Sequence, residues 1–97
     1  MKLVFDIETD DLKATKIWCL VAKDIVSNKL YTYGPDQIEE GCQLLSEADE
    51  LIGHNIIGFD LPVLRDLTRF KTLGCGQKTV DTLVLSRRFD PVREAGH

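Results

Sequence analysis

The sequence predicts an α/β fold built on one mixed sheet of about five strands. Three observations support this prediction. The chain opens with a β-favouring run at Leu3–Ile7, two further β-type runs follow around a tight turn, and a helical pattern separates them from a short apolar run at Glu50–Gly53. Strands joined by a tight turn are antiparallel, whereas a strand that follows a helix can return parallel to the first one. We therefore expect an antiparallel meander of three strands, extended by parallel strands.

The composition fits a single soluble domain. The chain has 97 residues, of which 43% are hydrophobic and 29% charged, and its formal charge is −4. This charge argues against a protein held to DNA or membrane by bulk electrostatics, but an enzyme that recruits Mg²⁺ needs local negative charge. No apolar run approaches the ~20 residues of a membrane span, and the N-terminus does not have the pattern of a signal peptide.

The three cysteines form no Cys-x-x-Cys pair that would hold zinc. Cys19 and Cys42 have apolar neighbours and are predicted to be buried thiols, which suits a reducing cytoplasm. Trp18 alternates with apolar residues in a predicted strand, and we interpret it as a packing residue.

The meander and the first helix follow in order. Residues 16–23 predict a second strand and residues 30–33 a third, joined by a hairpin turn at 27–28. Asp36 and Glu39 have the spacing of a capping box, which predicts the start of a helix. Apolar residues on one face of this helix recur at helical spacing, at Ile38, Cys42, Leu45 and Ala48.

A second helix is expected over residues 62–69, because Pro62 suits the first turn of a helix. Residues 79–80 are a possible fifth strand. Asp81 then stands where a cap is needed for a helix over residues 82–88. We assign Asp81 to capping, with support of a functional site as the alternative.

The chemistry is expected at the end of the first strand. Asp6 and Glu8 alternate in this strand, so they share one face, roughly 6.6 Å apart along it, and can converge on one divalent cation. Asp60 precedes the second helix, after a strand that can lie beside the first one, so it can face both carboxylates. The alternative readings are a solvated strand end for the pair and a helix cap for Asp60.

The order of elements, a strand and hairpin followed by helix, strand and helix, is that of an RNase H-like fold. Within it, Asp6-Ile-Glu8-Thr9 resembles the first motif of the DEDD, or DnaQ-like, 3′–5′ exonucleases. His54-Asn55 followed by Phe59-Asp60 resembles the second. The segment Asp81-Thr-Leu-Val-Leu-Ser-Arg87 is similar to the one that follows in proofreading domains of phage T7-like family A DNA polymerases.

This resemblance implies two-metal hydrolysis of the 3′-terminal phosphodiester by two Mg²⁺ or Mn²⁺ ions. Asp6 would bridge both ions, Glu8 would bind the ion that activates the attacking water, and Asp60 would complete the set of ligands. These three are the expected catalytic and metal-binding residues. The implied location is the cytoplasm of a phage-infected or bacterial host cell.

The resemblance also implies contacts to the 3′ end of single-stranded DNA. Thr9 and Leu12 would touch the terminal nucleotide, with Leu12 as an apolar wedge, and Asn55 and Phe59 would line the same cleft. From the residues alone, Asn55 and His54 could instead satisfy loop backbone groups, and Phe59 could belong to the core.

The family's third motif, Tyr-x-x-x-Asp or His-x-x-x-x-Asp, has no counterpart after Asp60. We therefore expect the N-terminal part of an exonuclease domain, with its C-terminal helices missing and its activity alone impaired. The missing parts could come from the remainder of a DNA polymerase, or from a second copy that covers an exposed sheet face. The competing hypothesis is a noncatalytic nucleic-acid-binding or assembly module derived from the same fold.

Overall fold

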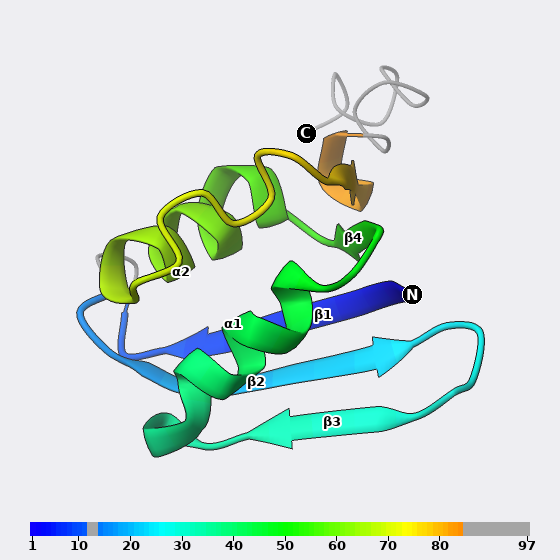
Figure 1. Ribbon diagram of the computed structural model, residues 1–97. Helices are drawn as coiled ribbons and strands as arrows, with labels where there is room; N and C mark the ends of the chain where they lie inside the picture. Colours follow the sequence, from blue (N-terminus) through cyan, green and yellow to red (C-terminus); the bar gives the residue numbers. More distant parts are fainter. Residues whose placement is uncertain (12–13, 85–97) are drawn as a thin grey trace, which may run out of the picture.

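The computed structural model describes residues 1–11 and 14–84. Five strands form one sheet in the order β3-β2-β1-β4-β5 (Figure 1). They are β1 (Lys2–Thr9), β2 (Ile17–Asp24), β3 (Leu30–Tyr33), β4 (Glu50–Gly53) and β5 (Lys78–Asp81). The pairs β1–β2 and β2–β3 are antiparallel, whereas β4 runs parallel to β1 and β5 parallel to β4. The predicted mixed sheet, with its meander of three strands, is confirmed.

Strand β1 separates the core from an open face. Its side chains alternate, so that Leu3, Phe5 and Ile7 are buried while Asp6 and Glu8 point the other way and are exposed. The buried set joins a single core cluster with apolar residues of both helices. The strand therefore carries its two carboxylates on the face opposite the core.

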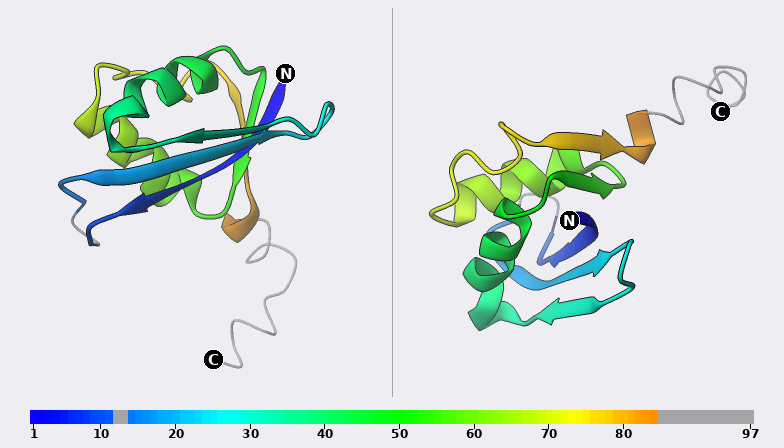
Figure 2. Two further views of the ribbon diagram at one scale, coloured as in Figure 1. Left: turned by 90° about the horizontal axis from the view of Figure 1, so that it is seen from below. Right: turned by 45° about the vertical axis from the view of Figure 1, so that its right-hand side comes forward.

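Helix α1 (Ile38–Ser46) covers the core face, as the left view of Figure 2 shows. The four apolar positions predicted for its inner face are all buried. A 3₁₀ turn at Pro35–Gln37 precedes it. The predicted capping box of Asp36 and Glu39 is wrong, because the box forms earlier: Gly34 is the N-cap, and the Gln37 side chain accepts the N–H of Gly34 at 3.2 Å. Glu39 instead accepts the backbone N–H of Arg69, at 3.0 Å.

The second helical segment begins earlier than the sequence predicts. A π-helical turn, η2 (Ile56–Asp60), leads directly into α2 (Leu61–Leu67). Pro62 lies in the first turn of α2 as expected, and its missing N–H suits a wider turn before it. Asp60 has helical backbone angles and makes no side-chain cap bond, so the reading of Asp60 as a helix cap is wrong.

Two predictions about β2 are corrected by its geometry. Cys42 is buried as expected, but Cys19 is only half-buried, because it pairs with Glu8 on the open face. Trp18 is not a core residue: it is 48% exposed at a register shift in the strand pair, and the ammonium group of Lys16 lies 4.4 Å from its ring centroid.

The end of the described chain starts another helix. Residues 82–84 have helical backbone, and the remainder of the helix predicted over residues 82–88 lies outside the described residues. The N–H of Leu83 donates to Asp81 Oδ1 at 2.9 Å, which confirms the predicted cap. Among the helices that the structure describes, none is long and apolar enough to cross a membrane.

Gln77 ties the segment before β5 to the end of α1. Its side-chain amide donates to the carbonyls of Leu45 and Ala48, at 2.8 and 2.6 Å, and its Oε1 accepts the N–H of Gly74, at 3.1 Å. Gln77→Ala leaves all three groups without this partner. We expect it to lower the free energy of unfolding by about 1–3 kcal/mol, measured by urea denaturation.

Gln43→Ala is the matched control for this prediction. The Gln43 amide donates to the exposed side chain of Glu47, the residue that follows α1, at 3.0 Å. Its loss should change stability by less than about 0.5 kcal/mol. Equal effects of the two substitutions would show that Gln77 acts only as a surface residue.

Candidate metal centre

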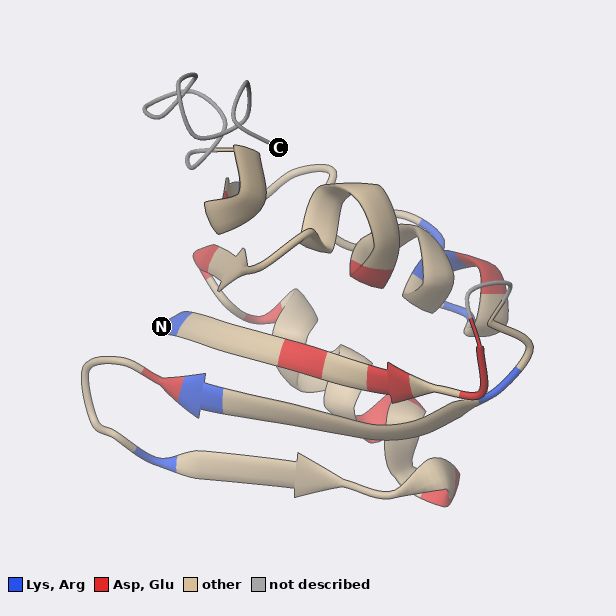
Figure 3. Ribbon diagram, turned by 180° about the vertical axis from the view of Figure 1, so that it is seen from behind, with Lys and Arg blue, Asp and Glu red and all other residues tan. Residues whose placement is uncertain are grey.

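Asp6 and Glu8 lie on the open face of the sheet. Figure 3 views the sheet from the side opposite α1 and shows these residues as two red segments of β1. Their side chains are exposed and alternate with the buried ones. Asp6 pairs with Val21, and Glu8 pairs with Cys19 just before the register shift that precedes Thr9. The predicted sharing of one face by the two carboxylates is confirmed.

Asp60 approaches β1 from the end of η2, which contacts both β1 and β5. The residue is only 4% exposed, and its Oδ2 atom has no hydrogen-bond partner among the described residues. Burial, and next the negative charge of Asp6, raise the pKa of Asp60 to about 7, although the backbone amides of Ile7 and Asp60 itself favour the charged form. Asp60 therefore lies beside the part of β1 that carries Asp6.

The donor set fits a hard divalent cation. Mg²⁺ and Mn²⁺ prefer carboxylate oxygens, and a buried carboxylate oxygen without a partner is costly unless a charge or donor meets it. Within residues 1–11 and 14–84, however, no group of three His, Cys, Asp or Glu side chains is arranged to hold a metal ion. The structure thus links Asp60 with Asp6, while the predicted pocket of three carboxylates stays a prediction.

Gly53 allows η2 to come this close to β1. A Cβ atom at this position would lie 2.4 Å from the Ile56 Cγ2 and 2.9 Å from the backbone oxygen of Phe5. Only glycine fits between the two segments without displacement. The small residue that ends β4 therefore determines how near Asp60 comes to Asp6.

Asp81 is a buried carboxylate whose wider role the sequence did not reveal. Its Oδ1 accepts the N–H of Asn55 at 2.8 Å, and its Oδ2 accepts the N–H of Ile57 at 2.9 Å, in addition to the cap bond to Leu83. Burial alone would raise the pKa of Asp81, but these amides outweigh it and the pKa lies below its ordinary value. The one indication of this role is the position of Asp81 at the end of β5, where it pairs with Gly53, next to the loop that it binds.

The residues expected to contact DNA have different surroundings. Asn55 is exposed and adopts a left-handed conformation, with φ of 59°. Phe59 is half-buried and packs against the core, in line with its alternative reading. The hydroxyl of Thr9 donates to the backbone carbonyl of Asp11 at 3.0 Å, and Leu12 lies outside the described residues. Contact with a nucleotide stays a prediction for all four.

His54 is exposed, and its Nδ1 lies 3.0 Å from the hydroxyl oxygen of Thr82. That hydroxyl also lies 3.4 Å from the carbonyl oxygen of Gly53 and is positioned to donate to it. His54 thus ties the loop after β4 to the residue that follows β5, through a side-chain partner and not through the loop backbone groups of its alternative reading.

Asp10 organises the loop between β1 and β2. Its carboxylate accepts the side-chain hydroxyl of Thr15 and the backbone N–H groups of Thr15 and Lys16, the latter two at 2.9 and 3.2 Å. The Thr15 hydroxyl has the largest effect and lowers the pKa of Asp10 to about 2. Desolvation opposes it, and the backbone amides of Lys16 and Thr15 add to the lowering. Asp10 thereby joins the end of β1 to the residues that lead into β2.

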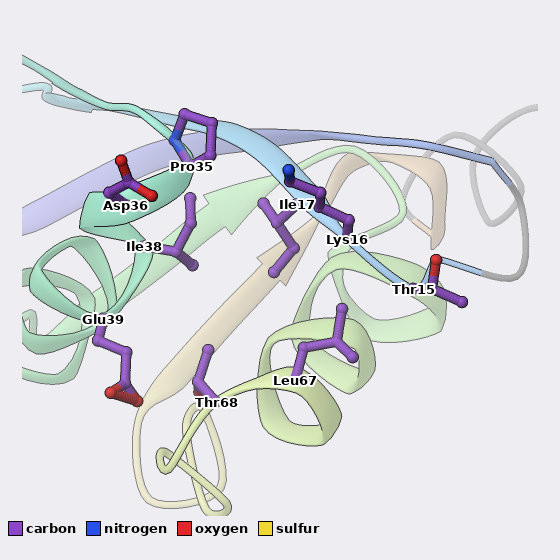
Figure 4. Close-up of a pocket in the computed structure, with 9 residues that line it drawn as sticks. All are labelled: Thr15, Lys16, Ile17, Pro35, Asp36, Ile38, Glu39, Leu67 and Thr68. Atoms are coloured by element: carbon purple, nitrogen blue, oxygen red, sulfur yellow. The ribbon is translucent and has the colours of Figure 1, made fainter.

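A pocket of about 270 Å³ lies between the start of β2, the start of α1 and the end of α2 (Figure 4). Ile17, Ile38 and Leu67 contribute apolar side chains to it, and Asp36 and Glu39 contribute acidic ones. Ligand sites are usually larger, about 300–1,000 Å³. None of the predicted metal-binding residues lines this pocket, so the pocket is not part of the candidate centre.

Comparison with known proteins identifies the fold but not a family. No protein-family model and no curated protein sequence matches this chain. Its structure is similar to part of the family B DNA polymerase from the hyperthermophilic archaeon Pyrobaculum calidifontis, with a TM-score of 0.71 and 17% sequence identity. The match covers 90% of this chain and 16% of the polymerase chain. The chain thus has the fold of a small part of a much longer protein.

Proposed function

We propose that this chain is a 3′–5′ exonuclease module of a phage-type DNA polymerase, with an RNase H-like fold and two Mg²⁺ or Mn²⁺ ions held by Asp6, Glu8 and Asp60. The observation that carries the proposal is the buried Asp60 carboxylate, whose Oδ2 lacks a partner among the described residues and whose pKa is raised in part by the charge of Asp6. The order of exonuclease-like motifs and the fold similarity to a DNA polymerase chain support it.

In this function the carboxylates have distinct roles. Bound divalent ions would supply an activated water and stabilise the leaving oxygen of the phosphodiester. Asp60, with a pKa of about 7, holds a proton in mildly acidic solution and would release it when a cation binds. Glu8 is exposed, so its side chain can rotate toward Asp6 without disturbing the core.

The substrate of this module is the 3′ end of single-stranded DNA. The open face around Asp6 leaves the site accessible to an extended strand, and the divalent ions would offset the net negative charge of the protein. Asn55 precedes η2, the turn that ends at Asp60, and would line the path of the strand. The assignment to T7-like family A polymerases rests on sequence resemblance, since the structural match is to a family B enzyme.

Hydrolysis is expected to be slow for this chain alone, because no third exonuclease motif follows Asp60. Loss of one ligand and of the group that orients the water would remove several kcal/mol of transition-state stabilisation. The remainder of a polymerase, or a second copy of the chain, would supply these groups.

The test compares the purified chain with an Asp6→Ala/Glu8→Ala variant. Each is incubated with Mn²⁺ and a 3′-end-labelled single strand, and Mn²⁺ binding is followed separately by electron paramagnetic resonance. An Asp36→Ala/Glu40→Ala variant is the matched control, because it removes two exposed carboxylates outside the candidate centre.

We expect the wild type and the control to bind Mn²⁺ and to release labelled mononucleotide slowly, and the site variant to do neither. Binding of Mn²⁺ without release would favour the noncatalytic nucleic-acid-binding or assembly module. Equal Mn²⁺ binding by wild type and site variant would contradict a metal centre at these residues.

A further inference from the structure

The bonds that Asp81 makes extend beyond a helix cap, and they lead to an inference that rests on the proposed function. We infer that Asp81 is the positioning residue of the metal centre, which fixes the loop at Asn55–Ile57 and thereby places Asp60 beside β1. Asp81 itself contacts neither metal nor substrate in this role.

The geometry of the carboxylate supports the inference. A cap needs only the bond from the N–H of Leu83 to Oδ1, at 2.9 Å. Asp81 also accepts two further hydrogen bonds, which join the end of β5 to the segment after β4. The donors are the N–H groups of Asn55 and Ile57, at 2.8 and 2.9 Å. Both carboxylate oxygens are therefore directed at the segment that enters η2. The residue is 4% exposed, so water does not compete effectively for these bonds.

The loop turns sharply where Asp81 binds it. Asn55 has a φ of 59°, the left-handed conformation that asparagine tolerates better than most residues, and its N–H is held by Asp81 Oδ1 at 2.8 Å. The turn that begins after Asn55 ends at Asp60, so the backbone angles of this residue set the direction of η2. A second tie at the same place, between His54 and Thr82, keeps the end of β5 against the loop.

The consequence for the metal centre follows from the rigidity of η2. Its five residues, Ile56–Asp60, form one helical turn, with Ile56 completely buried at its start. A shift of the loop at Asn55 therefore moves Asp60 relative to Asp6. Residues that orient metal ligands typically contribute a factor of about 10–100 to metal affinity.

The experiment measures Mn²⁺ affinity by electron paramagnetic resonance for the wild-type chain, Asp81→Asn and Asp81→Ala. Asp81→Asn keeps one acceptor oxygen, whereas Asp81→Ala removes all three bonds. The matched control is Asp24→Asn: Asp24 also accepts backbone N–H bonds, from Val26 and Ser27, but in the hairpin at the opposite end of β1. Affinities are compared at a temperature at which circular dichroism shows each protein to be folded.

We expect affinity to fall by about tenfold in Asp81→Asn and by up to about a hundredfold in Asp81→Ala, and to stay unchanged in Asp24→Asn. A lower melting temperature with unchanged affinity in the Asp81 variants would overturn the inference, because Asp81 would then support the fold alone. Absence of Mn²⁺ binding by the wild type would instead contradict the proposed function itself.

A measurement on the wild type keeps the inference testable if the Asp81 variants do not fold. Because coupling between two equilibria is reciprocal, bound Mg²⁺ should strengthen the bonds that Asp81 makes. We expect Mg²⁺ to slow hydrogen exchange of the Asn55 and Ile57 amides several-fold, and to leave the Val26 amide unchanged. Equal exchange with and without saturating Mg²⁺ would overturn the positioning role.

Discussion

In the absence of divalent cations near pH 8, Asp60→Asn should raise the free energy of unfolding by roughly 4 kcal/mol, while near pH 4 it should change it little. The cause is the burial of Asp60, helped by the charge of Asp6, which raises the pKa of this carboxyl from 3.8 to about 7. Each tenfold change in proton affinity corresponds to about 1.4 kcal/mol, and asparagine resembles the protonated acid in shape.

The direction follows from proton binding in the two states. Between about pH 4 and pH 7 the folded protein keeps the Asp60 proton, whereas the unfolded chain has lost it, so stability falls as the pH rises through this range and then levels off. Asp10, with its pKa lowered to about 2, acts in a different range: its contribution is present above its ordinary pKa of 3.8 and is lost as the pH falls through about 2.

Urea denaturation across this pH range, in the presence of a chelator, measures the effect. The fall in the free energy of unfolding between about pH 4 and pH 7 should be present in the wild type and in the exposed control Asp36→Asn. It should be absent in Asp60→Asn. Addition of Mn²⁺ near pH 8 should then stabilise the wild type but not Asp60→Asn, because only the ionised carboxylate gains a partner. An identical pH slope in wild type and Asp60→Asn would show that the folded state does not raise this pKa.

The sheet could be predicted because its signals are local. The alternation of Leu3, Phe5 and Ile7 with polar neighbours determines which face of β1 is buried, and the turn at 27–28 determines the antiparallel pairing of β2 and β3. Asn28 has a φ of 64°, the left-handed conformation that such a turn uses. The inward positions of α1 followed likewise from helical spacing.

The position of Asp60 near Asp6 was expected from the order of elements, but the contacts that support it are tertiary and could not be predicted from local sequence. Helical backbone begins at Ile56 rather than at Pro62, in a turn that is supported by Asp81 from β5. No local pattern links two segments more than twenty residues apart. Trp18 was misassigned for a related reason: a register shift beside Thr9 interrupts the strict alternation of β2 and leaves the ring exposed.

Gly53→Ala should be the most damaging methyl addition near the centre, with a loss of about 3 kcal/mol in the free energy of unfolding and weaker Mn²⁺ binding. The new Cβ would lie 2.4 Å from a methyl carbon of Ile56 and 2.9 Å from the Phe5 carbonyl oxygen. Ile56 is fully buried and β-branched, so its side chain cannot rotate away freely. Gly76→Ala is the matched control, because no described residue other than its two chain neighbours has an atom within 4 Å of the place that the added methyl group would occupy. It should be neutral or stabilising by up to about 1 kcal/mol.

A double-mutant cycle with Ile56→Ala separates the two contacts of the added methyl group. If the Ile56 side chain is the obstacle, Gly53→Ala should cost much less in the Ile56→Ala background than in the wild type, since the truncated side chain leaves room. If the Phe5 carbonyl dominates, the costs should add, because β1 itself must move. In the first case only η2 is displaced, so Gly53→Ala should lower Mn²⁺ affinity while the pairing of β1 with β4 stays intact. Unchanged stability in Gly53→Ala would contradict the close approach of η2 to β1 on which the candidate centre depends.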